Sequence, residues 1–160
     1  MTFRKIDIDL SDLDLKQFNT GICLHNPFKS YLSYYKLSYT HEHLLKNRLP
    51  EEFKNKFVRI FYCIMTGPGK LFPHIDKHST TAINYYIKPS DGITTFYKII
   101  AENYQHPTIT DSFKEDCLEE TGRFVAKEHE CYVLDVSKIH NVELFGTERH
   151  FINFAFKDVL

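Results

Sequence analysis

The sequence predicts a mainly β fold with flanking helices, built as a sandwich, a jelly roll or a cupin-like barrel. Two observations carry this prediction. The first half of the 160-residue chain is mixed, whereas the second half is a succession of six or seven short, strand-like runs. Their close spacing favours an antiparallel sandwich or barrel over a parallel sheet with crossover helices. We find no internal repeat or low-complexity linker, so we expect one domain over residues 1–160.

The N-terminal part of the chain carries the helix signals. We predict a short helix over 10–18 and a second helix over 41–49, with Thr40 as its cap. Pro50 followed by two acidic residues is typical of the first turn of a third helix. We therefore expect residues 1–55 to be a helical segment packed on a β core formed by residues 56–160.

The strand-like runs are rich in β-branched and aromatic residues and end at turn signals such as Thr66-Gly67-Pro68-Gly69 and Pro89-Ser90-Asp91-Gly92. We expect residues 101–122 to form a long excursion with one helical turn around 113–120. The strands are predicted at 57–65, 80–87, 93–100, 123–127, 131–136, 141–145 and 150–156.

Composition narrows the class of protein. The 20 basic and 21 acidic residues leave a net charge of -1, which argues against a dedicated nucleic-acid binder. The first residues lack the apolar region of a secretory signal, and no apolar run is long enough to span a membrane. We therefore expect a cytoplasmic protein. The four cysteines form no C-x-x-C pair, which predicts reduced thiols, with Cys63 and Cys131 as small buried residues.

The sharpest local motif is His74-Ile75-Asp76, which follows a strand and a glycine-rich turn. On an extended segment, residues two apart project to the same side, so both side chains can reach one ion. An imidazole with a carboxylate suits iron(II), manganese or zinc. A lone His-x-Asp is weak evidence, because the chain has nine histidines and such pairs arise by chance.

A second histidine and an arginine near the C-terminus strengthen the metal hypothesis. His140 follows a strand and a short turn, and Arg149 opens the last apolar strand. With His74 and Asp76 they form a set of two histidines and one carboxylate, accompanied by an anchor for an anion. Alternation along the last strand places Phe151 on the same side as Arg149 and His150 on the opposite side.

Three stretches together resemble the 2-oxoglutarate/iron(II)-dependent dioxygenase superfamily, in particular its small prolyl-hydroxylase-like or aspartyl-hydroxylase-like members. They are FYCIMTGPGKLFPHID, DGITTFY and ECYVLDVSKIHNVELFGTERHFINFAF. The resemblance covers about two-thirds of the chain, from Phe57 to the C-terminus. It implies a double-stranded β-helix core, that is, a cupin-like jelly roll.

The resemblance also implies an activity. His74, Asp76 and His140 would bind Fe(II), and Arg149 would bind the remote carboxylate of the co-substrate 2-oxoglutarate. Members of the family decarboxylate 2-oxoglutarate oxidatively to succinate and use this reaction to hydroxylate a second substrate. Here that substrate would be a small molecule or a peptide, which the sequence leaves unidentified.

Three further residues enter through the resemblance. Relatives often place a tyrosine hydroxyl on the co-substrate carboxylate, which points to Tyr62 on the strand before the metal loop. Asn84, in the middle of the strand after the motif, is expected to reach the co-substrate too. Lys88 competes with Arg149, because some branches of the family anchor 2-oxoglutarate from this earlier strand.

Three other classes of function stay open. A cupin-type isomerase or sugar-modifying enzyme would use a similar barrel without needing Arg149. A zinc hydrolase would need an additional general base near the metal. A non-catalytic jelly-roll binding protein would tolerate the loss of His140. A halogenase is disfavoured, because that branch lacks the carboxylate that Asp76 provides.

Overall fold

A computed structural model describes residues 1–25, 31–101 and 113–157. The helical elements are η1 (Leu15–Phe18), α1 (Tyr39–Asn47), α2 (Glu51–Lys54) and η2 (Glu115–Cys117). The strands are β1 (Phe3–Ile6), β2 (Cys23–His25), β3 (Leu32–Tyr35), β4 (Arg59–Thr66), β5 (Gly69–Lys70), β6 (Thr81–Lys88), β7 (Ile93–Ile99), β8 (Leu118–Val125), β9 (Cys131–Asp135), β10 (Ile139–Leu144) and β11 (Glu148–Phe156).

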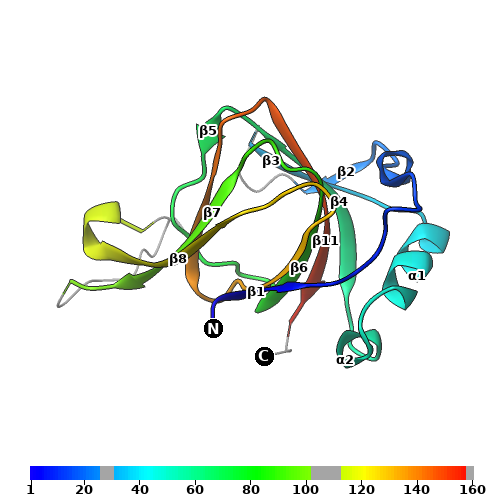
Figure 1. The fold of residues 1–160 in the computed structure, drawn as a ribbon, viewed down its shortest axis with the longest axis horizontal. Helices are drawn as coiled ribbons and strands as arrows, with labels where there is room; N and C mark the ends of the chain where they lie inside the picture. The colour runs from blue at the N-terminus through cyan, green and yellow to red at the C-terminus, as the bar shows by residue number, and fades with distance from the viewer. Residues whose placement is uncertain (26–30, 102–112, 158–160) are drawn as a thin grey trace.

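The strands form two antiparallel sheets that face one another (Figure 1). The larger sheet has seven strands in the order β1-β9-β6-β11-β4-β3-β2, and the smaller has four in the order β5-β10-β7-β8. Most neighbouring strands are not consecutive in the chain, as the crossing connections of a jelly roll require; the exceptions are β2-β3, β3-β4 and β7-β8. The predicted cupin-like jelly roll with flanking helices is therefore confirmed.

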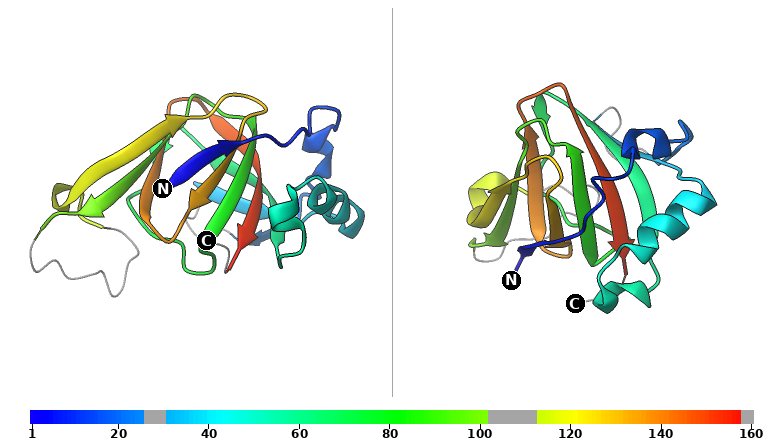
Figure 2. Two further views of the ribbon diagram at one scale, coloured as in Figure 1. Left: turned by 60° about the horizontal axis from the view of Figure 1, so that its bottom comes forward. Right: turned by 45° about the vertical axis from the view of Figure 1, so that its right-hand side comes forward.

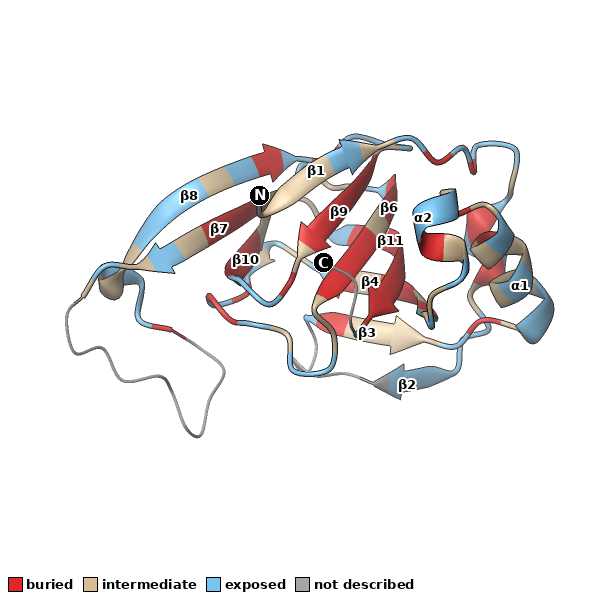
Figure 3. Cartoon of the chain, turned by 90° about the horizontal axis from the view of Figure 1, so that it is seen from below, coloured by how far each residue is buried: buried red, intermediate tan, exposed pale blue. Residues whose placement is uncertain are grey.

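The central strands of the larger sheet are buried on both faces. Residues that alternate along these strands belong to two different apolar clusters. On β4, Tyr62 belongs to the cluster under the helices, whereas Cys63 belongs to the cluster between the sheets. The first cluster includes Leu45 of α1 and Phe53 of α2, so these helices cover the outer face of the sheet (Figure 2). Figure 3 shows the buried residues concentrated on β6, β9 and β11, while β2 and much of β8 are exposed.

The predicted strands are found with boundary shifts of a few residues, but the N-terminal segment is less helical than expected. It contributes β1, β2 and β3 to the larger sheet, and only one turn of 3-10 helix lies within the predicted helix at 10–18. These strands have three or four residues each. Runs this short carry no readable alternation, and pairing with β9 and β4 stabilises them.

The other local differences concern caps and strand limits. Helix α1 begins earlier than predicted, because the Ser38 hydroxyl, rather than Thr40, accepts the hydrogen bond from the His41 amide. Pro50 is the residue before α2. The predicted helical turn at 113–120 is limited to η2, since β8 begins at Leu118; residues 102–112 of the expected excursion lie outside the described residues.

Two further observations concern the cysteines and the helices of the described residues. Cys63 and Cys131 are buried free thiols, and the described chain contains no disulfide. Among the described helices, none has the length and apolar character needed to cross a membrane.

Candidate metal centre

His74 and His140 are held side by side by their own backbones. The two residues form an antiparallel bridge in which each amide donates to the other's carbonyl over 2.9 Å. Directly opposed residues of an antiparallel pair project to the same side. The two imidazole rings consequently lie with their centroids 4.5 Å apart, and both side chains are buried.

Asp76 completes a three-residue cluster. Its amide donates to the Val136 carbonyl over 3.0 Å, which fixes the loop against the start of the turn after β9. Its Oδ1 lies 3.6 Å from Nε2 of His74 and 3.6 Å from Nε2 of His140. The three ligand atoms lie within 4.8 Å of one another. Ligands bound to one ion at about 2.1 Å and at right angles lie about 3 Å apart, so small side-chain adjustments would bring them onto one ion.

Backbone carbonyls orient both histidines for ligation. Nδ1 of His74 lies 2.8 Å from the Phe72 carbonyl, and Nδ1 of His140 lies 2.8 Å from the Lys138 carbonyl. Because a carbonyl only accepts, each Nδ1 carries the proton, and each Nε2 keeps its lone pair facing Asp76. Burial lowers the pKa of His140, which favours the neutral imidazole that a metal requires.

Burial also acts on Asp76, whose pKa it raises, while the neighbouring His74 opposes that shift. The Asp76 side chain is half-buried, so this carboxylate loses part of its hydration, and a cation between it and the two imidazoles would compensate for that loss. The donor set, its tautomers and its charge therefore suit a divalent metal ion.

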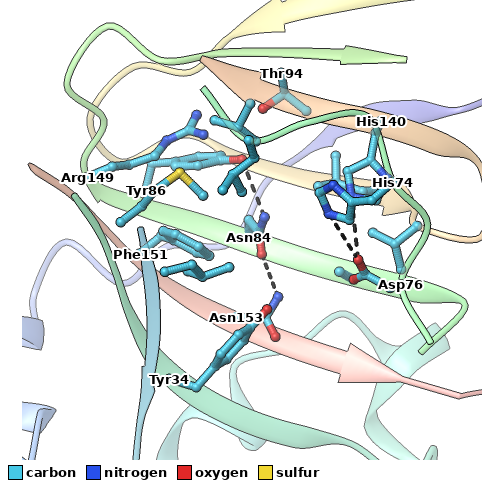
Figure 4. Close-up of a pocket in the computed structure, with 17 residues that line it drawn as sticks. Tyr34, His74, Asp76, Asn84, Tyr86, Thr94, His140, Arg149, Phe151 and Asn153 are labelled. Carbon is cyan, nitrogen blue, oxygen red and sulfur yellow. Dashed lines mark hydrogen bonds and ion pairs between the residues drawn. The ribbon is translucent and has the colours of Figure 1, made fainter. Parts of the chain in front are cut away.

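Arg149 lies in the same pocket as the three-residue cluster, at the opposite end (Figure 4). Its side chain is almost completely buried, with 1% of the residue exposed. Cζ lies 4.4 Å from the centroid of the Tyr86 ring. Within the described part of the chain, its Nε and Nη2 have no hydrogen-bond partner. Burial lowers the pKa of this guanidinium, and a buried cation without a carboxylate partner is costly. An anion bound in the pocket would remove that cost.

The structure does not bring Tyr62 into the pocket. Tyr62 points to the outer face of the larger sheet, where its hydroxyl lies 2.8 Å from Nδ1 of His150. This corrects the expectation that Tyr62 contacts the co-substrate; strand alternation places Cys63, one residue on, on the pocket side instead. Lys88 is exposed at the end of β6 and does not line the pocket, whereas Arg149 does.

A tyrosine that the sequence analysis did not identify lies in the pocket. Tyr86 of β6 lines the pocket, with its ring against Arg149. Asn84 also lines the pocket, and its amide lies 3.5 Å from the Tyr86 hydroxyl. Since Asn84 and Tyr86 are two residues apart on one strand, alternation from Asn84 could have identified Tyr86. Thr94 of β7 adds a buried hydroxyl that has no partner among the described residues.

The fold of this chain is similar to the folds of several solved structures. HygX from Streptomyces hygroscopicus, in a structure with nickel and 2-oxoglutarate bound, is 12% identical, with a TM-score of 0.62 over 99% of this chain and 84% of that chain. HygX with nickel, 2-oxoglutarate and hygromycin B bound gives a TM-score of 0.60 at 12% identity, over 99% of this chain and 84% of that chain. An oxidoreductase of the 2OG-Fe(II) oxygenase family from Burkholderia pseudomallei is 11% identical, with a TM-score of 0.53 over 89% and 75% of the two chains.

No protein-family model and no curated protein sequence matches the chain. At 11–12% identity, the structural likeness shows a shared jelly-roll fold and nothing finer.

Proposed function

We propose that this chain is a non-haem iron(II) dioxygenase that couples the oxidative decarboxylation of 2-oxoglutarate to the hydroxylation of a second substrate. One observation carries the proposal: a single pocket holds a cluster of two histidines and one carboxylate at one end and a buried, unpaired guanidinium at the other. The first suits a divalent cation, and the second suits the remote carboxylate of a dicarboxylic acid.

The donor set supports iron(II). His74, His140 and Asp76 would hold the ion through two imidazole nitrogens and one carboxylate oxygen, a ligand set typical of non-haem iron(II) oxygenases. When bound, iron(II) with 2-oxoglutarate would supply the oxidising power that consumes dioxygen, releases carbon dioxide and succinate, and places an oxygen atom on the substrate. A zinc hydrolase would need another general base, and the described pocket lining contains no second carboxylate.

The protein's own residues would hold the co-substrate in order. Arg149 would donate to its remote carboxylate through Nε and Nη2, and the ring of Tyr86 would keep the guanidinium in place. The Tyr86 hydroxyl and the unpaired Thr94 hydroxyl are further donors on this side of the pocket. Apolar side chains such as Leu134 and Val142 line the walls, and they would exclude water from the reacting atoms.

The proposal is tested by anaerobic titration of the apoprotein with iron(II) and then with 2-oxoglutarate, following the weak visible metal-to-ligand charge-transfer band. We expect the band in the wild-type protein, its loss in His140→Ala, and a requirement for far more 2-oxoglutarate in Arg149→Ala. His129→Ala is the matched control, because Nδ1 of His129 is hydrogen-bonded to the Tyr85 hydroxyl on the outer face of the sheet.

The alternatives give different results in this experiment. Iron binding without a band at any concentration of 2-oxoglutarate would favour a cupin-type metalloenzyme that does not use this co-substrate. A wild-type protein that binds no metal, and whose ligand binding is unaffected by His140→Ala, would indicate a non-catalytic binding protein. Activity itself is followed by dioxygen consumption and succinate release.

A further inference from the structure

Two asparagines form a polar strip beside the metal cluster, and one of them, Asn153, has no role in the proposed co-substrate site. Asn84 of β6 and Asn153 of β11 are register partners, so their side chains project side by side into the pocket. Nδ2 of Asn153 donates to Oδ1 of Asn84 over 2.8 Å. Figure 4 shows this pair on the pocket wall between Tyr86 and Asp76, with Tyr34 beyond Asn153.

The surroundings of these two amides are mostly apolar, so leaving their polar atoms without hydrogen bonds costs free energy. Asn153 is 7% exposed, and the adjoining pocket residues include Ala82, Leu134 and Phe151. A buried amide costs free energy unless its hydrogen-bonding groups are satisfied. The amide pair satisfies one donor and one acceptor. In the described part of the chain, Oδ1 of Asn153 accepts no hydrogen bond, and it is not sealed from solvent, so it faces the pocket.

Charge limits what can lie against this pair. Apart from the metal-binding residues, Arg149 is the only formally charged residue of the described lining. With a divalent ion, Asp76, Arg149 and the dianionic co-substrate in place, the charges in the pocket cancel. A charged substrate group buried there would then lack a counter-charge, which is unfavourable.

We infer that the Asn84–Asn153 pair binds an uncharged group of the prime substrate that both donates and accepts hydrogen bonds, a carboxamide or a hydroxyl. This inference rests on the proposed function. Oδ1 of Asn153 needs a donor and the remaining amide protons need acceptors, and a carboxamide or a hydroxyl provides both. A carboxylate has no donor for Oδ1 of Asn153, and an ammonium group has no acceptor for the amide protons.

The experiment uses protein loaded with manganese(II) and saturated with 2-oxoglutarate, which undergoes no turnover without iron. Four probes of one carbon skeleton are added separately: butyramide, butanol, butyrate and butylamine. Paramagnetic broadening of their proton NMR signals measures approach to the metal. We expect broadening of the butyramide and butanol signals and little broadening of the butyrate and butylamine signals. In Asn153→Leu, the affinity for butyramide should be about fivefold weaker, which corresponds to the loss of one hydrogen bond. His150→Gln is the control, because His150 lies on the same strand and faces outward.

Three outcomes would overturn the inference: equal broadening of the charged probes, no broadening of butyramide, or an unchanged amide affinity in Asn153→Leu. Thermal unfolding of each variant separates a local effect from a failure to fold. Manganese retention, read by electron paramagnetic resonance, and 2-oxoglutarate retention, read by equilibrium dialysis, are measured on the same samples. If either is lost in the wild-type protein, the proposed function itself fails and the inference falls with it; if both are retained, the probes test the inference alone.

Discussion

At the scale of single residues, the strongest constraint comes from Arg149. A buried guanidinium is retained only where something offsets the lost hydration, and the π face of Tyr86 at 4.4 Å provides part of this compensation. The unpaired Nε and Nη2 atoms leave the rest to a ligand. Tyr86 therefore has two roles in the proposed site: its ring positions Arg149, and its hydroxyl is available to the same carboxylate.

Replacing Tyr86 by Phe keeps the ring and removes the hydroxyl. We expect the affinity for 2-oxoglutarate to fall about tenfold, as for the loss of a hydrogen bond to a charged group, while iron(II) binding is unchanged. The measurement is a 2-oxoglutarate titration of the charge-transfer band. Tyr85→Phe is the matched control, because the adjacent hydroxyl faces outward and lies 2.9 Å from Nδ1 of His129. Equal affinities for 2-oxoglutarate in Tyr86→Phe and the wild type would show that the Tyr86 hydroxyl does not bind the co-substrate.

At the scale of elements, the turn between β6 and β7 supports the anion end of the pocket. Ser90 and Asp91 both have positive φ, at 52° and 51°, and the Gly92 amide donates to the Pro89 carbonyl over 3.1 Å. Both residues lie in the left-handed region that tight turns use, and the turn carries the chain from the larger sheet to the smaller one. The turn places Gly92 next to the Arg149 side chain. A Cβ added at Gly92 would lie 2.7 Å from Cδ2 of Leu144 and 3.1 Å from Cζ of Arg149.

Gly92→Ala is therefore expected to displace the guanidinium without touching the metal cluster. The predicted result is a 2-oxoglutarate affinity about tenfold or more below that of the wild type, since a charge-assisted pair depends strongly on geometry. Iron(II) affinity, measured by anaerobic titration, should stay the same. Asp91→Asn serves as the control within the same turn, because asparagine tolerates positive φ. A normal 2-oxoglutarate affinity in Gly92→Ala would show that Arg149 does not anchor the co-substrate.

At the scale of the whole molecule, the site depends on both sheets. Arg149, Tyr86 and Asn84 project from the larger sheet, whereas His140 belongs to β10 of the smaller one. The two backbone hydrogen bonds between His74 and His140 attach the loop that carries His74 and Asp76 to the smaller sheet. A ligand that bridges the two ends of the pocket binds only the folded protein, and it should stabilise that state by mass action.

Ligand-linked stability can be measured under anaerobic conditions by thermal unfolding with manganese(II) and 2-oxoglutarate. A ligand present at 100 times its dissociation constant adds about 2.7 kcal/mol to the free energy of unfolding. We expect manganese to raise the melting temperature of the wild type and of Arg149→Ala, and 2-oxoglutarate to add a further increase only in the wild type. Asp76→Ala should lose both effects. An equal metal effect in Asp76→Ala would place the metal elsewhere.

Much of the site follows from local sequence rules. His74 and Asp76 share a side because they are two residues apart on an extended segment, and Arg149, Phe151 and Asn153 line one wall of the pocket because of the same period. The fold class followed from the dense run of strand-like segments and the turn signals between them. These features depend on neighbouring residues alone, and neighbouring residues are what a sequence specifies directly.

Only the tertiary structure decided which face of each strand points into the pocket and which strands lie side by side. A shift of one residue exchanges the faces of a strand, so sequence reasoning chose Tyr62 and overlooked Tyr86, although both lie in well-predicted strands. The pairing of Asn84 with Asn153 depends on a register between segments 69 positions apart. The short strands β1, β2 and β3 likewise form by pairing with neighbours distant in sequence. Such contacts are set by the packing of the whole chain, because local propensity is too weak to specify them.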